Sequence, residues 1–128
     1  MHILLDIGNT RMKTSIADAD GIRRIDAWEE YIDKADDVLV SNVAGQDALP
    51  GILLGNPKCK VLTRDSDEAR VWLKQIPSGM GADRVAADIG ARSIYADRPL
   101  LVIDAGTCIT FDVIDTDGTI LGGAISPG

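Results

Sequence analysis

The sequence predicts an α/β protein with a mixed β-sheet, and three observations support this fold class. Three short strand-like stretches open the chain. Strand-like and helix-like stretches then alternate, with no low-complexity segment or Gly/Ser-rich linker between them. Two stretches, each an apolar run followed by D-x-G and later by a D-G turn, resemble each other, so the second half of the chain begins to repeat the first.

In the first half of the chain, the local patterns favour strands. An apolar run comes first, a second stretch alternates apolar and polar residues, and a D-A-D-G turn leads into a third stretch. After a polar stretch with some helical character, D-V-L-V-S-N-V-A has the composition of a buried strand, and C-K-V-L-T-R that of another. We expect strands at 2–6, 12–17, 22–27, 37–44 and 59–64, and a helix at 46–54.

In the second half, two helices are expected before one strong strand. Ser66 is a suitable N-cap with acidic residues around it, and Pro77 and Gly79 end that helix. An alanine-rich segment places Val85 and Ile89 on one side of a second helix. The apolar run P-L-L-V-I-D-A-G is the strongest strand pattern of the chain. We expect helices at 65–75 and 83–96 and a strand at 99–106.

Composition narrows the function classes. A chain of 128 residues can bury an ordinary hydrophobic core. The net charge of −7 argues against binding to duplex DNA, which requires a basic face. No apolar run is long enough to span a membrane, and Asp6 comes too early for a signal peptide, so we expect a cytoplasmic protein. Cys59 and Cys108 are far apart and indicate neither a zinc site nor a disulfide framework.

The two D-x-G turns have the residue types that a phosphate site needs. In each, an apolar strand leads into an aspartate, a glycine and a small polar residue, at 6–9 and 104–107. Glycine lets a polyphosphate approach the backbone, turn N–H groups donate to it, and a carboxylate holds a cation or its water shell. Lys13 could neutralise phosphate. Either turn alone is better explained as an ordinary hairpin, whereas the presence of both favours a nucleotide site.

Other phosphate-binding and calcium-binding motifs are absent. The chain has no G-x-x-x-x-G-K-[ST], and G-M-G-A-D-R lacks the third glycine and the preceding strand of a dinucleotide fingerprint. Neither D-A-D-G nor D-T-D-G is followed by the glutamate that closes a calcium loop. A P-loop, a Rossmann site and an EF-hand are therefore excluded.

The G-A-D-R motif at 81–84 lies at a junction between a loop and a helix. Asp83 could cap the helix or accept a proton from an alcohol. Arg84 could be solvated or could hold a substrate carboxylate with two hydrogen bonds. The spacing of these residues leaves both interpretations open.

Three motifs, in this order, resemble the N-terminal part of the type III pantothenate kinases. They are D-I-G-N-T-R-M-K at 6–13, G-A-D-R at 81–84, and a segment at 103–128 that contains D-x-G-T-x-x-T-x-D and G-G-x-I-x-P-G intact. That family belongs to the superfamily of acetate and sugar kinases, Hsp70 and actin, in which two RNase-H-like domains enclose ATP. The resemblance implies a first such domain at 1–98 and the first strands of a second, apparently truncated, at 99–128.

The resemblance implies phosphorylation of pantothenate to 4'-phosphopantothenate by ATP, the first step of coenzyme A biosynthesis. It implies Mg²⁺ or a similar divalent ion near Asp6, a monovalent cation, K⁺ or NH₄⁺, at Asp104, and Asp83 as the catalytic proton acceptor. The implied ATP-binding residues are Asp6, Ile7, Gly8, Asn9, Thr10, Arg11, Met12, Lys13 and Thr107, and the implied pantothenate-binding residues are Gly81, Ala82, Asp83 and Arg84.

Two features differ from the family pattern. Lys74 stands where family members commonly carry a tyrosine that helps to enclose pantothenate. The chain ends at Gly128, whereas the family continues through a second domain that adds contacts to both substrates, some of them across a dimer. We therefore expect a homodimer at full length and an inactive 128-residue chain. Another small-molecule kinase of the superfamily, or a non-catalytic nucleotide-binding or regulatory relative, is the alternative.

Overall fold

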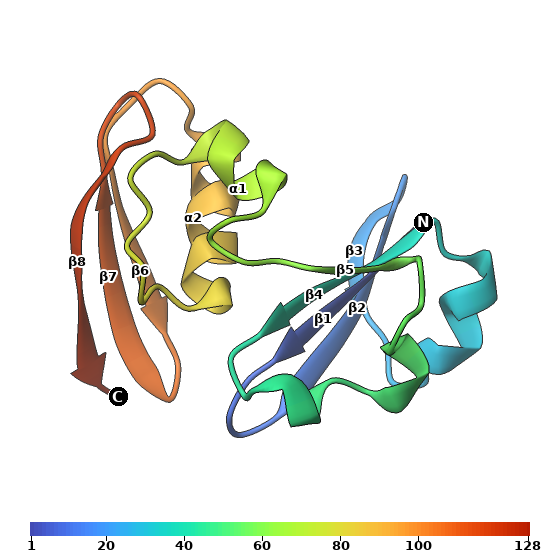
Figure 1. Ribbon diagram of the computed structural model, residues 1–128. Helices are drawn as coiled ribbons and strands as arrows, with labels where there is room; N and C mark the ends of the chain where they lie inside the picture. Colours follow the sequence, from blue (N-terminus) through green and yellow to red (C-terminus); the bar gives the residue numbers. More distant parts are fainter. The chain divides into compact units, whose positions relative to one another are not determined.

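The structure is a computed structural model that describes residues 1–128, and by packing the chain divides into two compact units (Figure 1). Unit 1 is Met1–Leu62, and unit 2 is Thr63–Gly128. Both units combine strands with helical segments, and the sheet of unit 1 is mixed, so the predicted α/β class is confirmed. None of the helices has both the length and the apolar character needed to cross a lipid bilayer.

Unit 1 is built on a five-stranded sheet. Its strands are β1 (His2–Ile7), β2 (Met12–Asp18), β3 (Gly21–Arg24), β4 (Asp37–Asn42) and β5 (Cys59–Val61). The order across the sheet is β3-β2-β1-β4-β5. The first three strands pair antiparallel through short turns, whereas β4 and β5 run parallel to β1. Parallel neighbours need a crossover, which the helical segment between β3 and β4 supplies.

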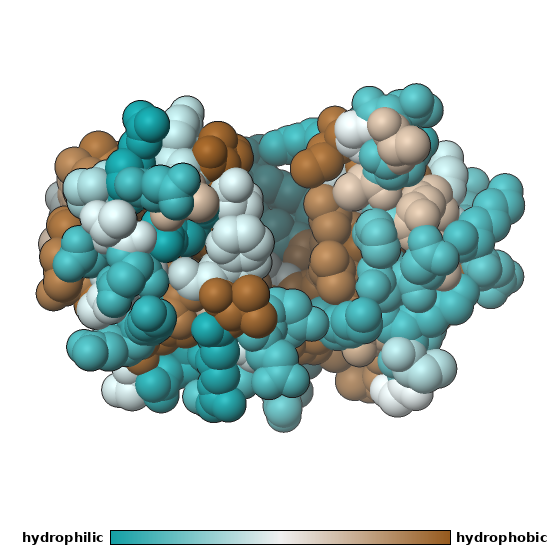
Figure 2. Space-filling model, turned by 90° about the horizontal axis from the view of Figure 1, so that it is seen from above, coloured by the Kyte–Doolittle hydropathy of each residue, from teal (hydrophilic) through white to brown (hydrophobic).

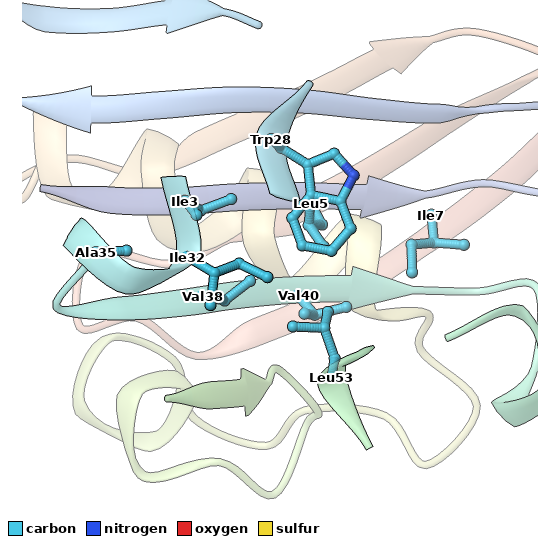
Figure 3. Close-up of a cluster of buried hydrophobic side chains, with 9 residues drawn as sticks. All are labelled: Ile3, Leu5, Ile7, Trp28, Ile32, Ala35, Val38, Val40 and Leu53. Carbon is cyan, nitrogen blue, oxygen red and sulfur yellow. The ribbon is translucent and has the colours of Figure 1, made fainter. Parts of the chain in front are cut away.

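One face of this sheet carries an apolar core. Alternate residues of β1 and β4 point to the same face because side chains in a strand alternate between its two sides. Trp28 and Ile32 from the 3₁₀ helix η1 (Trp28–Lys34) reach toward these strands, as Figure 3 shows. The cluster consists of Ile3, Leu5, Ile7, Trp28, Ile32, Ala35, Val38, Val40 and Leu53, all of them buried.

The helix expected at 46–54 is wrong. The segment forms two separate 3₁₀ turns, η2 (Gln46–Ala48) and η3 (Gly51–Leu53). Pro50 lies between them and lacks the N–H that a continuous helix would use, while its carbonyl accepts from Leu53 N at 2.9 Å. The third, fourth and fifth expected strands are present but shorter than expected, as β3, β4 and β5.

Unit 2 combines two α-helices with a three-stranded antiparallel sheet (Figure 1). Helix α2 packs on β6 and β7, and α1 packs on α2. Residues of the sheet that face α2 are buried, among them Ile114 and Ile120. The predicted helices and the predicted strand are present, but the first helix, expected at 65–75, is much shorter, and the other two elements differ slightly at their ends. The elements are α1 (Asp67–Trp72), α2 (Ala82–Ile94), β6 (Leu100–Ala105), β7 (Cys108–Ile114) and β8 (Ile120–Pro127).

The other face of the β6-β7-β8 sheet exposes apolar side chains. Leu101 and Ile103 on β6 are 60% and 55% exposed, and Leu101 pairs with the exposed Val113 on β7. Figure 2 shows hydrophobic residues gathered along the left margin, the side on which this sheet lies in Figure 1. The sheet of unit 2 is therefore covered on one face only.

The packing boundary and the expected domain boundary do not coincide. Because α2 packs on the strands that follow it, residues 63–98 belong to the same compact unit as residues 99–128. Packing thus divides the chain after Leu62. The expected domains, 1–98 and 99–128, rest on the repeated motif and on the family resemblance, and they stay a prediction.

Candidate active site

The first D-x-G turn closes the β1–β2 hairpin at one end of the sheet of unit 1. Asp6 and Lys13 are partners across the strands, and Lys13 Nζ lies 3.6 Å from Asp6 Oδ2. The Gly8 N–H donates to the carbonyl oxygen of Arg11 at 3.1 Å and closes the turn. A Cβ at residue 8 would lie 3.3 Å from that oxygen, so glycine suits this tight turn. The turn therefore places a carboxylate and an ammonium group together, both in contact with solvent.

The residues of this hairpin divide between solvent and core. Ile7 is buried in the apolar cluster, so only its backbone is available at the turn. Asn9, Thr10 and Arg11 are exposed and offer amide, hydroxyl and guanidinium groups. The turn can thus present several hydrogen-bond donors to an anion while its strands stay anchored in the core.

The second D-x-G turn closes the β6–β7 hairpin of unit 2. Asp104 is the last residue but one of its strand, as Asp6 is of β1, and its partner across the hairpin is Thr110. The Gly106 N–H donates to the Cys108 carbonyl oxygen at 2.9 Å, which makes this turn tight as well. Asp104 and Thr107 are exposed. The two turns therefore present their aspartates from equivalent strand positions.

The G-A-D-R motif forms the first turn of α2. Gly81 is the N-cap residue, with extended backbone and no capping side chain. Val85 N donates to the Gly81 carbonyl oxygen at 3.1 Å and begins the helix. Asp83 Oδ1 accepts from the Arg84 N–H at 2.8 Å, whereas Asp83 Oδ2 makes no hydrogen bond. A carboxylate in this position is stabilised by the positive end of the helix dipole.

The Arg84 side chain makes a two-pronged ion pair with Asp112 in the middle of β7. Its Nε donates to Asp112 Oδ2 at 3.0 Å, and its Nη2 donates to Asp112 Oδ1. The two side chains are only 14% and 3% exposed. The hydrogen bonds that Arg84 donates to Asp112 raise the pKa of Arg84 above its usual value. Arg84, for which the sequence left solvation and a substrate carboxylate as alternatives, thus holds a carboxylate of the protein itself.

Asp88 lies one helical turn after Arg84 and is fully buried. Neither of its carboxyl oxygens has a hydrogen-bond partner. Burial and the neighbouring Asp112 raise the pKa of Asp88 to about 7, against the opposing effect of Arg84. Two aspartates and one arginine therefore share a buried site between α2 and the sheet.

The sequence analysis did not identify Asp88 or Asp112 as part of the site. Asp112 is the last residue of D-x-G-T-x-x-T-x-D. Asp88 follows Arg84 by four residues, which places Arg84 and Asp88 on one face of the helix. The charged residues Arg84 and Asp88, four positions apart on one face of the predicted helix, were the available signal. It indicates a buried partner only once the strand that faces the helix is known.

Comparisons with known proteins bear on this arrangement. A sequence model of the family described as type III pantothenate kinase matches residues 29–128. The chain belongs to the type III pantothenate kinase family. The matched range includes G-A-D-R and the second D-x-G turn, but not the first turn at 6–13.

Two relatives in the type III pantothenate kinase family align with the whole chain. The protein of Bacteroides fragilis (strain YCH46) is 33% identical over 140 residues, which cover 100% of this chain and 58% of the relative. The protein of Herminiimonas arsenicoxydans is 30% identical over 159 residues, covering 100% of this chain and 59% of the relative. The chain thus spans somewhat more than half the length of these family members, and the first turn lies within the aligned part.

A solved structure supports the fold. A protein of Sinorhizobium meliloti assigned as a 2-dehydro-3-deoxygalactonokinase matches with a TM-score of 0.54 and 15% sequence identity. The match covers 98% of this chain and 53% of that one. At this identity the similarity concerns the fold alone.

Lys74 is the residue at which we expected a departure from the family pattern. Its backbone pairs with the β7–β8 turn, through Lys74 N to the Gly118 carbonyl at 2.9 Å and Ile120 N to the Lys74 carbonyl at 3.0 Å. Its side chain is exposed, with Nζ 3.6 Å from Asp117 Oδ2. The backbone of this position is thus fixed, while the side chain is directed to a surface carboxylate.

The predicted site residues fall into three groups in the family member described here. Residues 6–13 lie at the hairpin of unit 1, residues 81–84 begin α2 of unit 2, and Asp104 and Thr107 lie at the β6–β7 turn of unit 2. No group of three or more His, Cys, Asp or Glu side chains is close enough to hold a metal ion. A cation at either aspartate would therefore need ligands from phosphate, water or the backbone.

Proposed function

We propose that this chain supplies the first part of an ATP-dependent pantothenate kinase that forms 4'-phosphopantothenate, at the start of coenzyme A biosynthesis. The observation that carries the proposal is the presence, in a member of this family, of two D-x-G hairpins with their aspartates at equivalent strand positions. G-A-D-R at a helix start adds a carboxylate suited to proton transfer.

The proposal includes an RNase-H-like fold for the repeated domains. The order β3-β2-β1-β4-β5, with three antiparallel strands followed by two parallel ones, supports this for unit 1. The β6–β8 sheet supports it for the second domain because it repeats the hairpin and the following antiparallel strand. The domains at 1–98 and 99–128 are part of the same proposal.

The phosphates of ATP are proposed to bind at the turns. In the first turn, the exposed side chains of Asn9, Arg11 and Lys13 offer donors. The turn backbone adds to them, except for the Gly8 N–H, which already donates to the Arg11 carbonyl oxygen. Ile7 contributes through its backbone because its side chain lies in the core. Thr107 is proposed to contact ATP from the second turn.

The two aspartates suit two kinds of cation. A single carboxylate with phosphate and water as further ligands is a usual environment for Mg²⁺, and the half-exposed Asp6 fits it. Asp104, exposed beside Gly106 and Thr107, is proposed to hold K⁺ or NH₄⁺. A divalent ion bound with ATP would neutralise charge on the phosphates.

Pantothenate is proposed to bind at the first turn of α2, at Gly81, Ala82, Asp83 and Arg84, with the guanidinium group of Arg84 held by Asp112 rather than by the substrate. Asp83 accepts the proton of the pantothenate hydroxyl as that oxygen bonds to the γ-phosphorus and the bond to the ADP oxygen breaks. Asp83 Oδ2 is suited to this step because only Oδ1 is used within the helix turn. Because phosphoryl transfer depends mainly on positioning and charge stabilisation, Asp83 acts as one contributor among several.

The assembly of the whole enzyme is part of the proposal. The family resemblance supports a cytoplasmic homodimer in which further contacts to both substrates come from a second domain. We call the family-length protein a protein that contains this chain and the further part that the relatives have beyond the aligned region. The chain alone, which spans 58% of the Bacteroides fragilis relative, is expected to be inactive.

The test is ADP release by the family-length protein with ATP and a panel of alcohols. Release that depends on pantothenate supports the proposal, and release with another alcohol instead supports a different kinase of the superfamily. Nucleotide binding without release with any alcohol supports a regulatory relative. The 128-residue chain is assayed in parallel, and robust pantothenate-dependent release by it would contradict the expected need for the second domain.

A further inference from the structure

We infer that Asp112 and Arg84 form a clamp that positions Asp83, so that Arg84 acts as a positioning residue; the reaction in which this matters rests on the function proposed above. The inference begins from the guanidinium group, whose Nε and Nη2 both donate to the Asp112 carboxylate. A planar guanidinium that makes two parallel hydrogen bonds to one carboxylate has its orientation fixed by them.

The clamp connects the middle of a strand to the first turn of a helix. Asp112 lies between Val102 of β6 and Gly123 of β8 in the sheet, so its backbone is held by strands on both sides. Arg84 is in the first turn of α2. The helix start, which has no capping side chain, is thereby tied to the most constrained strand of the unit.

Arg84 also connects directly to Asp83. Its backbone N–H donates to Asp83 Oδ1 at 2.8 Å, while its side chain is bound to Asp112. One residue is thus fixed at both ends, and the Asp83 carboxylate is fixed to it. Asp83 Oδ2 stays without a hydrogen bond, in a position set by the clamp.

Gly123 makes room for the clamp. A Cβ at residue 123 would lie 2.5 Å from Arg84 Nη2, 2.6 Å from the Phe111 carbonyl oxygen, and even closer to Asp112 Oδ1. No real Cβ contact is that short, and the nearest atoms belong to a buried ion pair and to backbone. The packing therefore explains why the second glycine of G-G-x-I-x-P-G, Gly123, is a glycine in this chain. Any side chain there would displace the guanidinium group of Arg84.

Because the side chains of Arg84 and Asp112 are largely buried, few other groups can pair with the guanidinium of Arg84. A buried arginine needs a carboxylate partner, and Asp88 is a second carboxyl group within the same site. Asp88 makes no hydrogen bond, so the guanidinium is directed to Asp112 alone. The alternative role for Arg84, a direct contact with a substrate carboxylate, would require the Asp112 pair to open.

The experiment separates positioning from substrate binding and from stability. Four variants of the family-length protein are compared with the wild type: Arg84→Lys, which keeps the charge but loses the fork, Asp112→Asn, their double variant, and Arg84→Met/Asp112→Leu. The last replaces the buried pair by apolar side chains of similar size, which often restores stability. Asp65→Asn, which breaks the exposed Arg70–Asp65 pair, is the matched control.

The clamp predicts that kcat falls about 10- to 100-fold in Arg84→Lys and in Asp112→Asn, with KM for pantothenate changed less than about threefold. The kcat of the double variant should be little lower than that of either single variant, because both substitutions break the same Arg84–Asp112 ion pair. Arg84→Met/Asp112→Leu should fold stably and still show the loss of kcat. Asp65→Asn should behave as the wild type. A large rise of KM in Arg84→Lys with normal kinetics in Asp112→Asn would overturn the inference, and so would additive losses.

Hydrogen exchange gives a readout that does not depend on the reaction. In Arg84→Lys and Asp112→Asn, the amides of Arg84 and Val85 should exchange at least about 10-fold faster than in the wild type, relative to the Tyr95 amide at the other end of α2. Unchanged relative protection would show that the clamp positions nothing. If the wild type releases no ADP with pantothenate, the proposed function fails, and hydrogen exchange alone still decides whether the clamp exists.

Discussion

The two units bury different kinds of side chain beside their sheets. In unit 1, the residues between η1 and the sheet are all apolar, with Trp28 at 1% exposure among them. In unit 2, the buried set between α2 and the sheet includes Asp88 and Asp112, which are the buried charged residues of the chain. No charged side chain of unit 1 is buried, and its ion pairs, such as Asp6–Lys13 and Asp18–Arg23, are partly exposed.

This difference indicates two ways of holding a functional group. The hairpin at 6–13 begins at β1, whose alternate side chains are buried in the apolar core. The positions of the polar atoms in the hairpin therefore depend on this packing and on the hydrogen bond that closes the turn. The first turn of α2 is held instead by a buried ion pair. Unit 1 should therefore respond most to loss of packing, and unit 2 to loss of charge pairing.

The largest expected effect tests packing in unit 1. Trp28→Ala should lower the free energy of unfolding by about 3–5 kcal/mol, because it removes a fully buried aromatic side chain and leaves a cavity. Chemical denaturation measures this change. Trp72→Ala is the matched control, since Trp72 is 38% exposed and should cost clearly less. Equal costs for the two variants would contradict the assignment of the core.

The next effect tests the buried charge of unit 2 through pH. The pKa of Asp88 is raised to about 7, above the ~3.9 of an unfolded chain, so the unfolded state loses this proton first as pH rises. The contribution of Asp88 to stability therefore falls between about pH 4 and about pH 7. Asp88→Asn should remove that dependence and stabilise the protein at higher pH by no more than ~4 kcal/mol.

Asp18 in unit 1 provides the contrast to Asp88. Its hydrogen bond from Arg23 lowers the pKa of Asp18, so its contribution is present above the unfolded pKa and is lost as pH falls. Denaturation of Asp88→Asn and Asp18→Asn across pH separates the two signs. A wild-type curve that Asp88→Asn leaves unchanged would contradict a buried, protonated Asp88.

The third prediction concerns the reaction. Asp83→Asn in the family-length protein should lower kcat about 100-fold, because the amide cannot accept the hydroxyl proton. The variant keeps the shape of the side chain and the hydrogen bond to the Arg84 N–H, so its folding should be unchanged. Steady-state kinetics with pantothenate measure the loss. Near-normal turnover would contradict the assignment of Asp83 as the catalytic base.

A smaller effect should separate the two aspartates of the D-x-G turns. Asp104→Ala should reduce by several-fold the preference for potassium or ammonium over sodium, because it removes the carboxylate from the proposed monovalent site. Rates of the family-length protein in sodium, potassium and ammonium buffers test this. Asp6→Asn is the comparison, and it should instead weaken binding of the metal–nucleotide complex, which changes the dependence of the rate on magnesium concentration. A preference that survives in Asp104→Ala would place the site elsewhere.

The smallest effect on stability concerns the exposed face of unit 2. Leu101→Ser with Ile103→Ser should change the free energy of unfolding by no more than about 0.5–1 kcal/mol, since both side chains are more than half exposed. It should nevertheless reduce self-association of the 128-residue chain, because exposed apolar patches promote it. Sedimentation at increasing concentration measures this, and unchanged association would show that the face is not responsible.

The sequence predicted the strands better than the contacts between elements. Apolar runs and D-G turns indicated β1, β2 and β6 because these signals are local. The helix at 46–54 was wrong because Pro50 outweighed its helical pattern. The packing boundary after Leu62 could not be predicted, because it depends on α2 packing forward onto β6 and β7.

The candidate site was predicted in part. Asp6, Asp83 and Asp104 were recognised from short motifs that carry their own chemistry, and their proposed roles stay predictions. The partnership of Arg84 with Asp112 was not foreseen, since it joins a helix to a strand that lies well beyond it in sequence. Pairings of this kind follow from tertiary packing, and the sequence pattern contains no local signal for them.

The most direct test of the account is transfer of labelled γ-phosphate from ATP to pantothenate by the family-length protein. The account predicts labelled 4'-phosphopantothenate with the wild type, a loss of about 100-fold with Asp83→Asn, and an unchanged rate with Asp65→Asn. Label found only on another alcohol, or no labelled product from a folded protein that binds ATP, would contradict it.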